Sequence, residues 1–116
     1  MYVSIARALV TQPDILLMDE PFGALDEITR DRLNEELLRI WRETRTTVVF
    51  VTHSLSEAAF LGQSVIIMGA NPGRIVKEMD LDKRKPDNRI DRTRPEFFAI
   101  TSELRAVLEG NGAVQP

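Results

Sequence analysis

Two adjacent carboxylates, Asp19 and Glu20, follow the four apolar residues Ile15–Met18. Four residues are too few for a helix and are typical of a strand that is buried on both faces. Pro21 lacks an N–H group, so strand pairing is expected to stop there. Ligands of an open parallel α/β sheet bind outside the carboxyl ends of its strands. Because neighbouring side chains on a strand point in opposite directions, one carboxylate could hold Mg²⁺ through water while the other faces an attacking water.

A histidine occupies a similar position farther along the chain. His53 follows Thr46–Val51, a β-branched run that predicts a second buried strand. At the carboxyl end of that strand, His53 is expected at the sheet edge that carries Asp19 and Glu20. A histidine at a strand end is by itself more often a structural hydrogen-bonding residue, so its meaning depends on these neighbours.

These residues belong to longer motifs. Ile15–Asp26, in which Asp-Glu-Pro is followed by Gly-Ala-Leu-Asp, resembles the Walker B segment and D-loop of an ABC transporter ATPase. Phe22-Gly-Ala-Leu-Asp26 is similar to the importer form. Ser4–Leu9 resembles the helix that follows the ABC signature, and Val48–His53 resembles the next strand with its switch histidine. The three motifs occur in the order and at the spacing of that family.

The resemblance implies a role for each site residue, with ATP and Mg²⁺ as cofactors. Asp19 would hold the Mg²⁺ that bridges the β- and γ-phosphates. Glu20 would orient or deprotonate the attacking water. His53 would contact the γ-phosphate and help to fix the water. Asp26 would lie near ATP at the interface of two ATPase subunits.

The implied fold class is α/β. We expect a P-loop NTPase-type, mainly parallel sheet with flanking helices, present as its C-terminal half only, plus a C-terminal hairpin and helix. Asp26 can cap a helix whose buried stripe includes Leu33 and Leu37. Ser54–Glu57 reads as a capping box that opens a short helix. The turn Asn71-Pro72-Gly73 predicts a hairpin between two further strands, Ser64–Met68 and Arg74–Leu81.

Four segments are expected along the chain. Residues 1–81 form the C-terminal part of the ATPase domain, beginning with a helix that is already under way near Met1. Residues 82–94 carry mostly charged side chains and form a polar linker. Residues 95–110 form an amphipathic helix, with Phe97, Ile100 and Leu104 on one face. Residues 111–116 form a frayed tail.

Composition excludes several classes of protein. The 116 residues have a net charge of −3, which gives no reason to expect nucleic acid as a partner. No apolar run approaches the roughly 20 residues of a membrane span. The absence of cysteine excludes a disulfide framework and a thiolate metal site. The resemblance to ABC transporter ATPases implies a location in the cytoplasm, peripheral on the inner face of the cell membrane.

The resemblance becomes more specific in two segments, Asn71–Val76 and Asp91–Phe97. Together they are similar to the C-terminal segments of nitrate, sulfonate and taurine-type import ATPases. Riboflavin- or pyrimidine-type importers also fit. The implied function is ATP hydrolysis coupled to uptake of a small solute. The implied partners are a second ATPase subunit, a membrane permease and, indirectly, a periplasmic or lipoprotein solute-binding protein.

Neither the Gly-x-x-x-x-Gly-Lys-Ser/Thr phosphate loop nor a Leu-Ser-Gly-Gly signature occurs in the 116 residues. We therefore expect a fragment that is inactive on its own, and a non-catalytic interaction module is the main alternative. A phospho-acceptor signalling domain would need an acidic pair after an earlier strand and a lysine after a later strand, and the sequence has neither. A chromosome or repair ATPase would carry long coiled coils, and no sustained heptads occur here.

Overall fold

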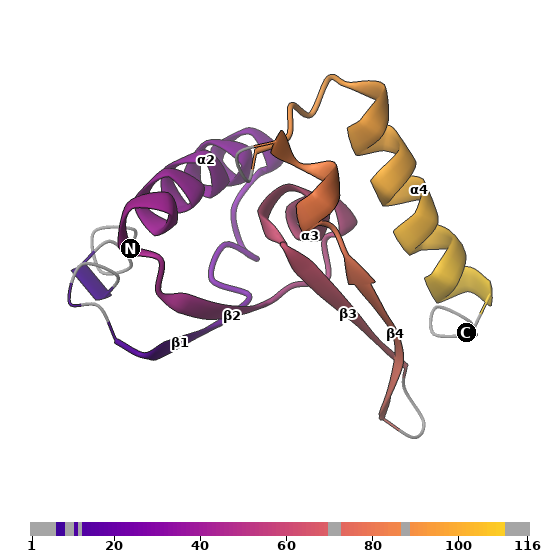
Figure 1. Cartoon of the computed structure of the whole chain (residues 1–116), viewed down its shortest axis with the longest axis horizontal. Helices are drawn as coiled ribbons and strands as arrows, with labels where there is room; N and C mark the ends of the chain where they lie inside the picture. The colour runs from indigo at the N-terminus through magenta and orange to yellow at the C-terminus, as the bar shows by residue number, and fades with distance from the viewer. Residues whose placement is uncertain (1–6, 9–10, 12, 70–72, 87–88, 111–116) are drawn as a thin grey trace. The chain divides into compact units, whose positions relative to one another are not determined.

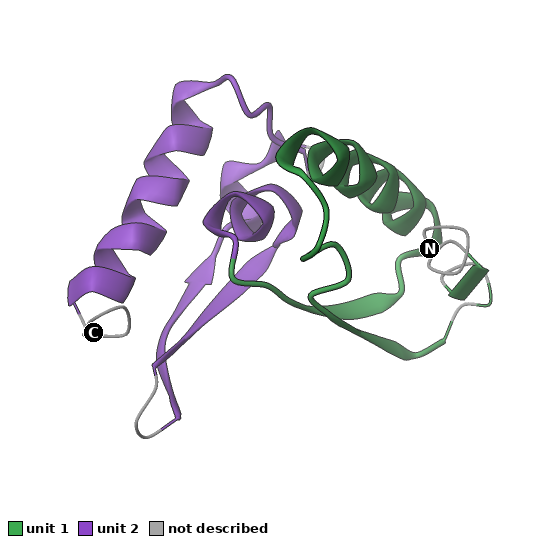
Figure 2. Cartoon of the chain, turned by 180° about the vertical axis from the view of Figure 1, so that it is seen from behind, with its two compact units in different colours: residues 1–53 green, residues 54–116 purple. Residues whose placement is uncertain are grey.

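The structure is a computed structural model that describes residues 7–8, 11, 13–69, 73–86 and 89–110 (Figure 1). The chain divides into two compact units, residues 1–53 and 54–116 (Figure 2). Together they give a mixed α/β chain with a parallel sheet and helices. Most of the helix expected near Met1, and all of the tail 111–116, lie outside the described residues.

Unit 1 contains a strand–helix–strand arrangement (Figure 1). Strand β1 (Ile15–Asp19) pairs in parallel with β2 (Thr47–Val51), so that Ile15 lies opposite Thr47 and Asp19 lies opposite Val51. Helix α2 (Glu27–Thr44) connects the two strands. The parallel pairing confirms the prediction from the strand and helix pattern, and it places the two carboxyl ends at one edge.

Helix α2 begins where its sequence predicts, directly after Asp26. The Asp26 carboxylate accepts a hydrogen bond of 3.0 Å from the backbone N–H of Thr29, as expected of an N-cap. At the other end Arg45 has a φ of 59°, and its N–H donates to the carbonyl of Trp41 at 2.7 Å. The Trp41 indole N–H donates to the Thr46 carbonyl at 2.6 Å, which ties the end of the helix to the start of β2.

The strands of unit 1 are not buried on both faces, which corrects the prediction made from their apolar runs. Ile15 and Leu17 are 67% and 66% exposed, and Val49 and Val51 on the same face are also exposed. Met18 is buried, because alternation turns it to the opposite face. Figure 1 shows α2 on one side of this two-stranded sheet, so one helix covers one face.

Unit 2 is a hairpin with two helices. Helix α3 (Leu55–Leu61) follows the cap Ser54, whose hydroxyl accepts from the Glu57 N–H at 3.2 Å. Strand β3 (Ser64–Gly69) pairs antiparallel with β4 (Arg74–Asp80), which confirms the predicted hairpin. A single turn of 3-10 helix, η1 (Asp82–Arg84), precedes helix α4 (Pro95–Gly110).

The core of unit 2 lies where α4 packs against α3 and β3. Its fully buried side chains come from α3, from the residue that follows β4 and from α4, and they are Ala59, Leu81, Ile100 and Leu104. Ile100 and Leu104 belong to the stripe that the sequence predicts for this helix. Among the described residues, no helix is both long enough and apolar enough to cross a membrane.

Candidate functional site

The candidate site lies at the carboxyl edge of the β1–β2 pair. Asp19 is the last residue of β1, and His53 comes two residues after β2 ends at Val51. The backbone N–H of Glu20 donates to the Val51 carbonyl at 2.7 Å, one residue beyond the end of β1. This bond holds the Glu20 backbone beside Val51, the last residue of β2, although the two residues are far apart in the sequence.

Glu20 has an unusual backbone conformation. Its φ is 45°, a value at which a side chain with a Cβ atom is strained. A tight turn follows, in which the Glu20 carbonyl accepts from the Gly23 N–H at 3.2 Å and the Phe22 carbonyl accepts from the Leu25 N–H at 3.1 Å. Such strain persists only where the surrounding structure holds it, and it is often found at functional sites.

Phe22 anchors this turn. Its side chain is only 1% exposed, and its ring centroid lies 6.2 Å from that of Phe50 on β2, with the ring planes tilted by 49°. A tilted pair at this separation is a favourable aromatic contact. No role was predicted from the sequence for the Phe22 or Phe50 side chain. The available signal was a large aromatic side chain between Pro21 and Gly23 in a turn.

The side chains of Glu20 and His53 are brought together. Glu20 Oε1 lies 3.5 Å from His53 Nδ1. The side chains are 43% and 77% exposed, respectively, so both remain accessible to a ligand. The pair becomes an ion pair when His53 is protonated, and an interaction this exposed contributes little to stability.

Asp26 is the N-cap of α2, as the sequence predicts. The hydrogen bond from the Thr29 backbone N–H lowers the pKa of its carboxyl below the usual range. Arg30 supports the same loop, because its guanidinium donates to the Leu25 carbonyl at 3.0 Å. Asp26 thus remains ionised, exposed and fixed in direction at the start of α2.

Asp19 lies on the exposed face of β1, directly before Glu20. Within the part of the chain that the structure describes, no group of three or more His, Cys, Asp and Glu side chains could hold a metal ion. Magnesium in phosphate-binding sites usually keeps several waters and uses one or two carboxylates. The exposed Asp19 carboxylate could serve as one ligand of such a largely hydrated ion.

No protein-family model matches the chain. Individual proteins do match over most of it. The chain is 50% identical over 111 residues to the taurine import ATP-binding protein TauB of Rhizobium johnstonii, covering 91% of the chain and 42% of that protein. It is 46% identical over 107 residues to the aliphatic sulfonates import ATP-binding protein SsuB of Bacillus subtilis, covering 92% and 41%.

The nitrate import ATP-binding protein NrtD of a Synechocystis strain is 40% identical over 114 residues, which cover 93% of the chain and 43% of that protein. The chain spans about two fifths of the length of these curated relatives. Over most of its own length, the chain is homologous to the ATP-binding subunits of ABC importers.

Proposed function

We propose that this chain is the C-terminal part of a P-loop NTPase-type ATPase subunit, one that couples ATP hydrolysis to import of a small solute through an ABC transporter. The observation that carries the proposal is the Glu20–His53 pair at the carboxyl edge of two parallel strands. The identities of 40–50% to import ATP-binding proteins support it.

Glu20 is the general base or water-orienting group in this proposal. Its carboxylate is partly exposed, and the bond from its backbone N–H to Val51 fixes its position. His53 presents Nδ1 toward Glu20, which leaves Nε2 for the γ-phosphate of ATP. Positioning of this kind is the main contribution that a protein makes to phosphoryl transfer.

Asp19 is the proposed ligand of Mg²⁺, held through water. The ion would supply charge neutralisation for the β- and γ-phosphates. The nearby Asp26, directed by its capping bond to Thr29, is the proposed contact to a second ATPase subunit near its ATP. The two carboxylates would then serve the metal and the subunit interface, while Glu20 serves the water.

We propose residues 1–81 as the C-terminal part of the ATPase domain, residues 82–94 as a linker and residues 95–110 as a C-terminal helix. The proposed partners are a second ATPase subunit, a permease and, indirectly, a solute-binding protein. The proposed location is the cytoplasmic face of the membrane. The relatives are named for taurine, aliphatic sulfonates and nitrate, so we propose a small anion or zwitterion of this kind as the solute.

A second candidate is a binding or interaction module without turnover. The observation that favours it is that no Gly-x-x-x-x-Gly-Lys-Ser/Thr loop occurs in these 116 residues. Tight binding of the ATP phosphates by P-loop proteins depends on the backbone N–H groups and lysine of that loop.

The test uses the full-length ATP-binding subunit reconstituted with its permease in lipid vesicles. ATP hydrolysis is measured against Mg²⁺ concentration, with a solute-binding protein loaded with taurine, an alkyl sulfonate or nitrate. Asp19→Asn should raise the Mg²⁺ concentration needed for half-maximal hydrolysis. Asp14→Asn is the matched control, because Asp14 is exposed and precedes the same strand. Equal Mg²⁺ dependence in the parent and Asp19→Asn would remove Asp19 from the metal site.

A further inference from the structure

One lysine of the segment 82–94 is buried. Lys85 is 3% exposed, whereas the neighbouring Lys83 is exposed. The Lys85 ammonium donates to two backbone carbonyls, those of Phe60 at 3.2 Å and of Gly62. Burial lowers the pKa of Lys85 to about 8, and the charge of Asp82 opposes that shift. A buried lysine is uncommon unless its charge is compensated.

The carbonyls that Lys85 reaches are those at the C-terminal end of α3. The last carbonyls of any helix lack partners within the helix. Here Gly62 follows the helix in an extended conformation, with a φ of −77°, so the left-handed glycine cap that ends many helices is not formed. The Gln63 side chain donates to the Leu61 carbonyl at 3.2 Å. Side chains therefore cap this end of the helix, and Lys85 donates two hydrogen bonds where Gln63 donates one.

Position 62 has no room for a side chain, because α3 and the start of β3 lie close to it. A Cβ atom at this position would lie 2.8 Å from Val65 Cγ2 and 2.9 Å from the Ala58 carbonyl oxygen. The next residue, Gln63, uses its carbonyl to accept from the Leu81 N–H at 2.8 Å. The chain at 81–85 is thus held against the end of α3 by backbone and side-chain bonds.

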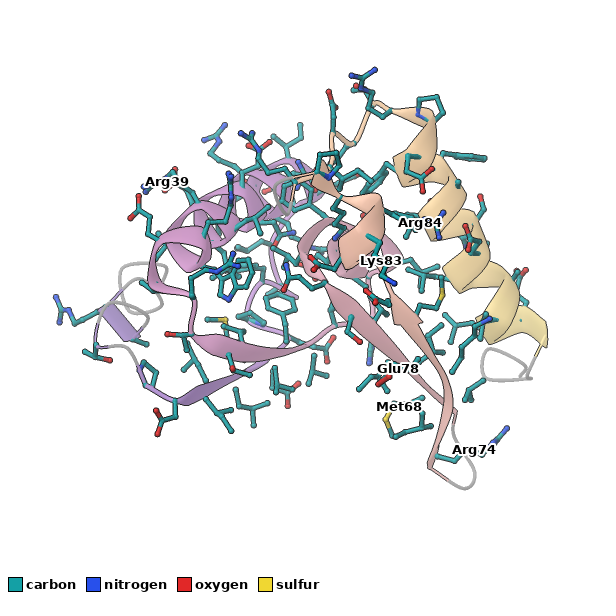
Figure 3. All side chains as sticks on the ribbon, viewed as in Figure 1. Arg39, Met68, Arg74, Glu78, Lys83 and Arg84 are labelled. Carbon is teal, nitrogen blue, oxygen red and sulfur yellow. The ribbon has the colours of Figure 1, made fainter. Side chains whose placement is uncertain are left out.

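Two further interactions extend the attachment. The guanidinium carbon of Arg92 lies 3.8 Å from the centroid of the Phe60 ring, so Phe60 is contacted by Arg92 through its ring and by Lys85 through its carbonyl. On the other side, Arg84 donates to carboxylates of α4, to Glu96 through Nε and to Glu103 through both terminal nitrogens at 3.0 and 2.6 Å. Figure 3 shows Arg84 beside α4 and labels the neighbouring Lys83.

We propose that residues 81–86 and 89–94 act as a clasp that caps the C-terminal end of α3 and couples this helix to α4, with Lys85 as the residue that closes the clasp. The clasp joins α3 through Lys85 and Arg92, and it joins α4 through Arg84. Helices α3 and α4 also pack on each other. The two helices consequently open as one cooperative unit, and loss of the Lys85 bonds loosens both. This conclusion goes beyond ATP hydrolysis and does not depend on it.

The first test is hydrogen–deuterium exchange on the full-length protein with Lys85→Met. Methionine keeps an unbranched side chain in the buried site and removes the donor, leaving the Phe60 and Gly62 carbonyls without it. Amides in both α3 and α4 should exchange about tenfold faster, which corresponds to about 1.4 kcal/mol. Amides of α2 in unit 1 should not change.

Lys83→Met is the matched control, because it removes the same charge from an exposed position two residues away. Its exchange should equal that of the parent in both helices. Faster exchange in α3 with unchanged α4 would overturn the coupling. Unchanged exchange in both helices would overturn the role of Lys85.

The second test needs no variant and therefore does not depend on whether Lys85→Met folds. Lysine amines of the native full-length protein are acetylated for increasing times and then quantified by mass spectrometry. Lys85 should react more than about tenfold more slowly than the exposed Lys77 and Lys83, because its reaction requires the clasp to open. Equal rates at Lys85 and Lys83 would show that the clasp is not closed in the native protein.

Discussion

In the full-length protein, replacing Glu20 with glutamine should slow ATP hydrolysis by orders of magnitude and leave the fold of unit 1 unchanged. A carboxylate can accept the proton of an attacking water, whereas an amide of the same shape cannot. A general base contributes about 10²–10⁴-fold in rate, so the barrier should rise by about 3 to 5 kcal/mol. ATP binding should persist, and closed ATP-bound dimers should accumulate because the step that separates them is blocked.

The effect of this substitution on stability should be small, because Glu20 supports the fold through its backbone. Its N–H bond to Val51 and its carbonyl bond from Gly23 survive in the glutamine variant, as does the φ of 45°. The substitution removes the exposed charge interaction between the Glu20 carboxylate and His53 at 3.5 Å. Exposed ion pairs contribute little, so the free energy of unfolding should change by less than about 0.5 kcal/mol.

Steady-state ATP hydrolysis, equilibrium ATP binding and thermal unfolding of the full-length protein check these expectations together. Glu20→Gly is a useful companion, since glycine tolerates positive φ and relieves a strain of about 1–2 kcal/mol. That variant should be at least as stable as the parent and should lose hydrolysis to a similar extent. Hydrolysis by Glu20→Gln within about threefold of the parent, about 0.7 kcal/mol, would remove Glu20 from the base role.

Three further predictions concern other residues and the chain as a whole. In the full-length protein, His53→Ala should cut turnover strongly and change nucleotide affinity little; a large loss of ADP affinity with normal turnover would contradict the assignment. The 116-residue chain alone should show no ATPase activity, no tight MgATP binding in calorimetry and self-association in sedimentation, because Leu17 and Val49 are exposed on an open sheet face. A monodisperse monomer that binds MgATP with micromolar affinity would overturn that expectation. For Lys85, the unfolded state binds a proton between about pH 8 and 10.5 that the folded state has released, so the free energy of unfolding should increase as the pH rises through this window. The increase should be absent in Lys85→Met, and a pH profile shared by the parent and this variant would argue against the pKa of Lys85 as its cause.

Much of the local structure could be predicted from short-range patterns. The capping bonds of Asp26 and Ser54 depend on a polar side chain and a backbone N–H three residues later, so a few neighbouring residues suffice to specify them. The hairpin β3–β4 follows from two strand-forming runs around a turn. The parallel pairing of β1 and β2 follows from strand–helix–strand alternation.

The pattern could not predict how much of each strand is covered. An apolar run indicates that a strand can be buried on both faces, but burial depends on which layers are present. In this structure Ile15 and Leu17 are exposed and Met18 is buried, because α2 lies against one face of the sheet. The periodicity of a sequence shows which side chains are apolar and which face of a strand they share. The exposure of those side chains depends on whether another element of the chain packs on that face.

The sequence by itself determined the types and order of the chemical groups: a carboxylate pair at one strand end, a histidine at the next, and a family resemblance that covers both. Tertiary structure decided which of them meet. It set the φ of Glu20, placed its carboxylate beside His53, and buried Lys85 in a segment whose charges indicated a polar linker. The physical reason is that capping and periodicity act between near neighbours. A strained φ or a buried ammonium is stabilised by partners distant in sequence, and local spacing does not encode those partners.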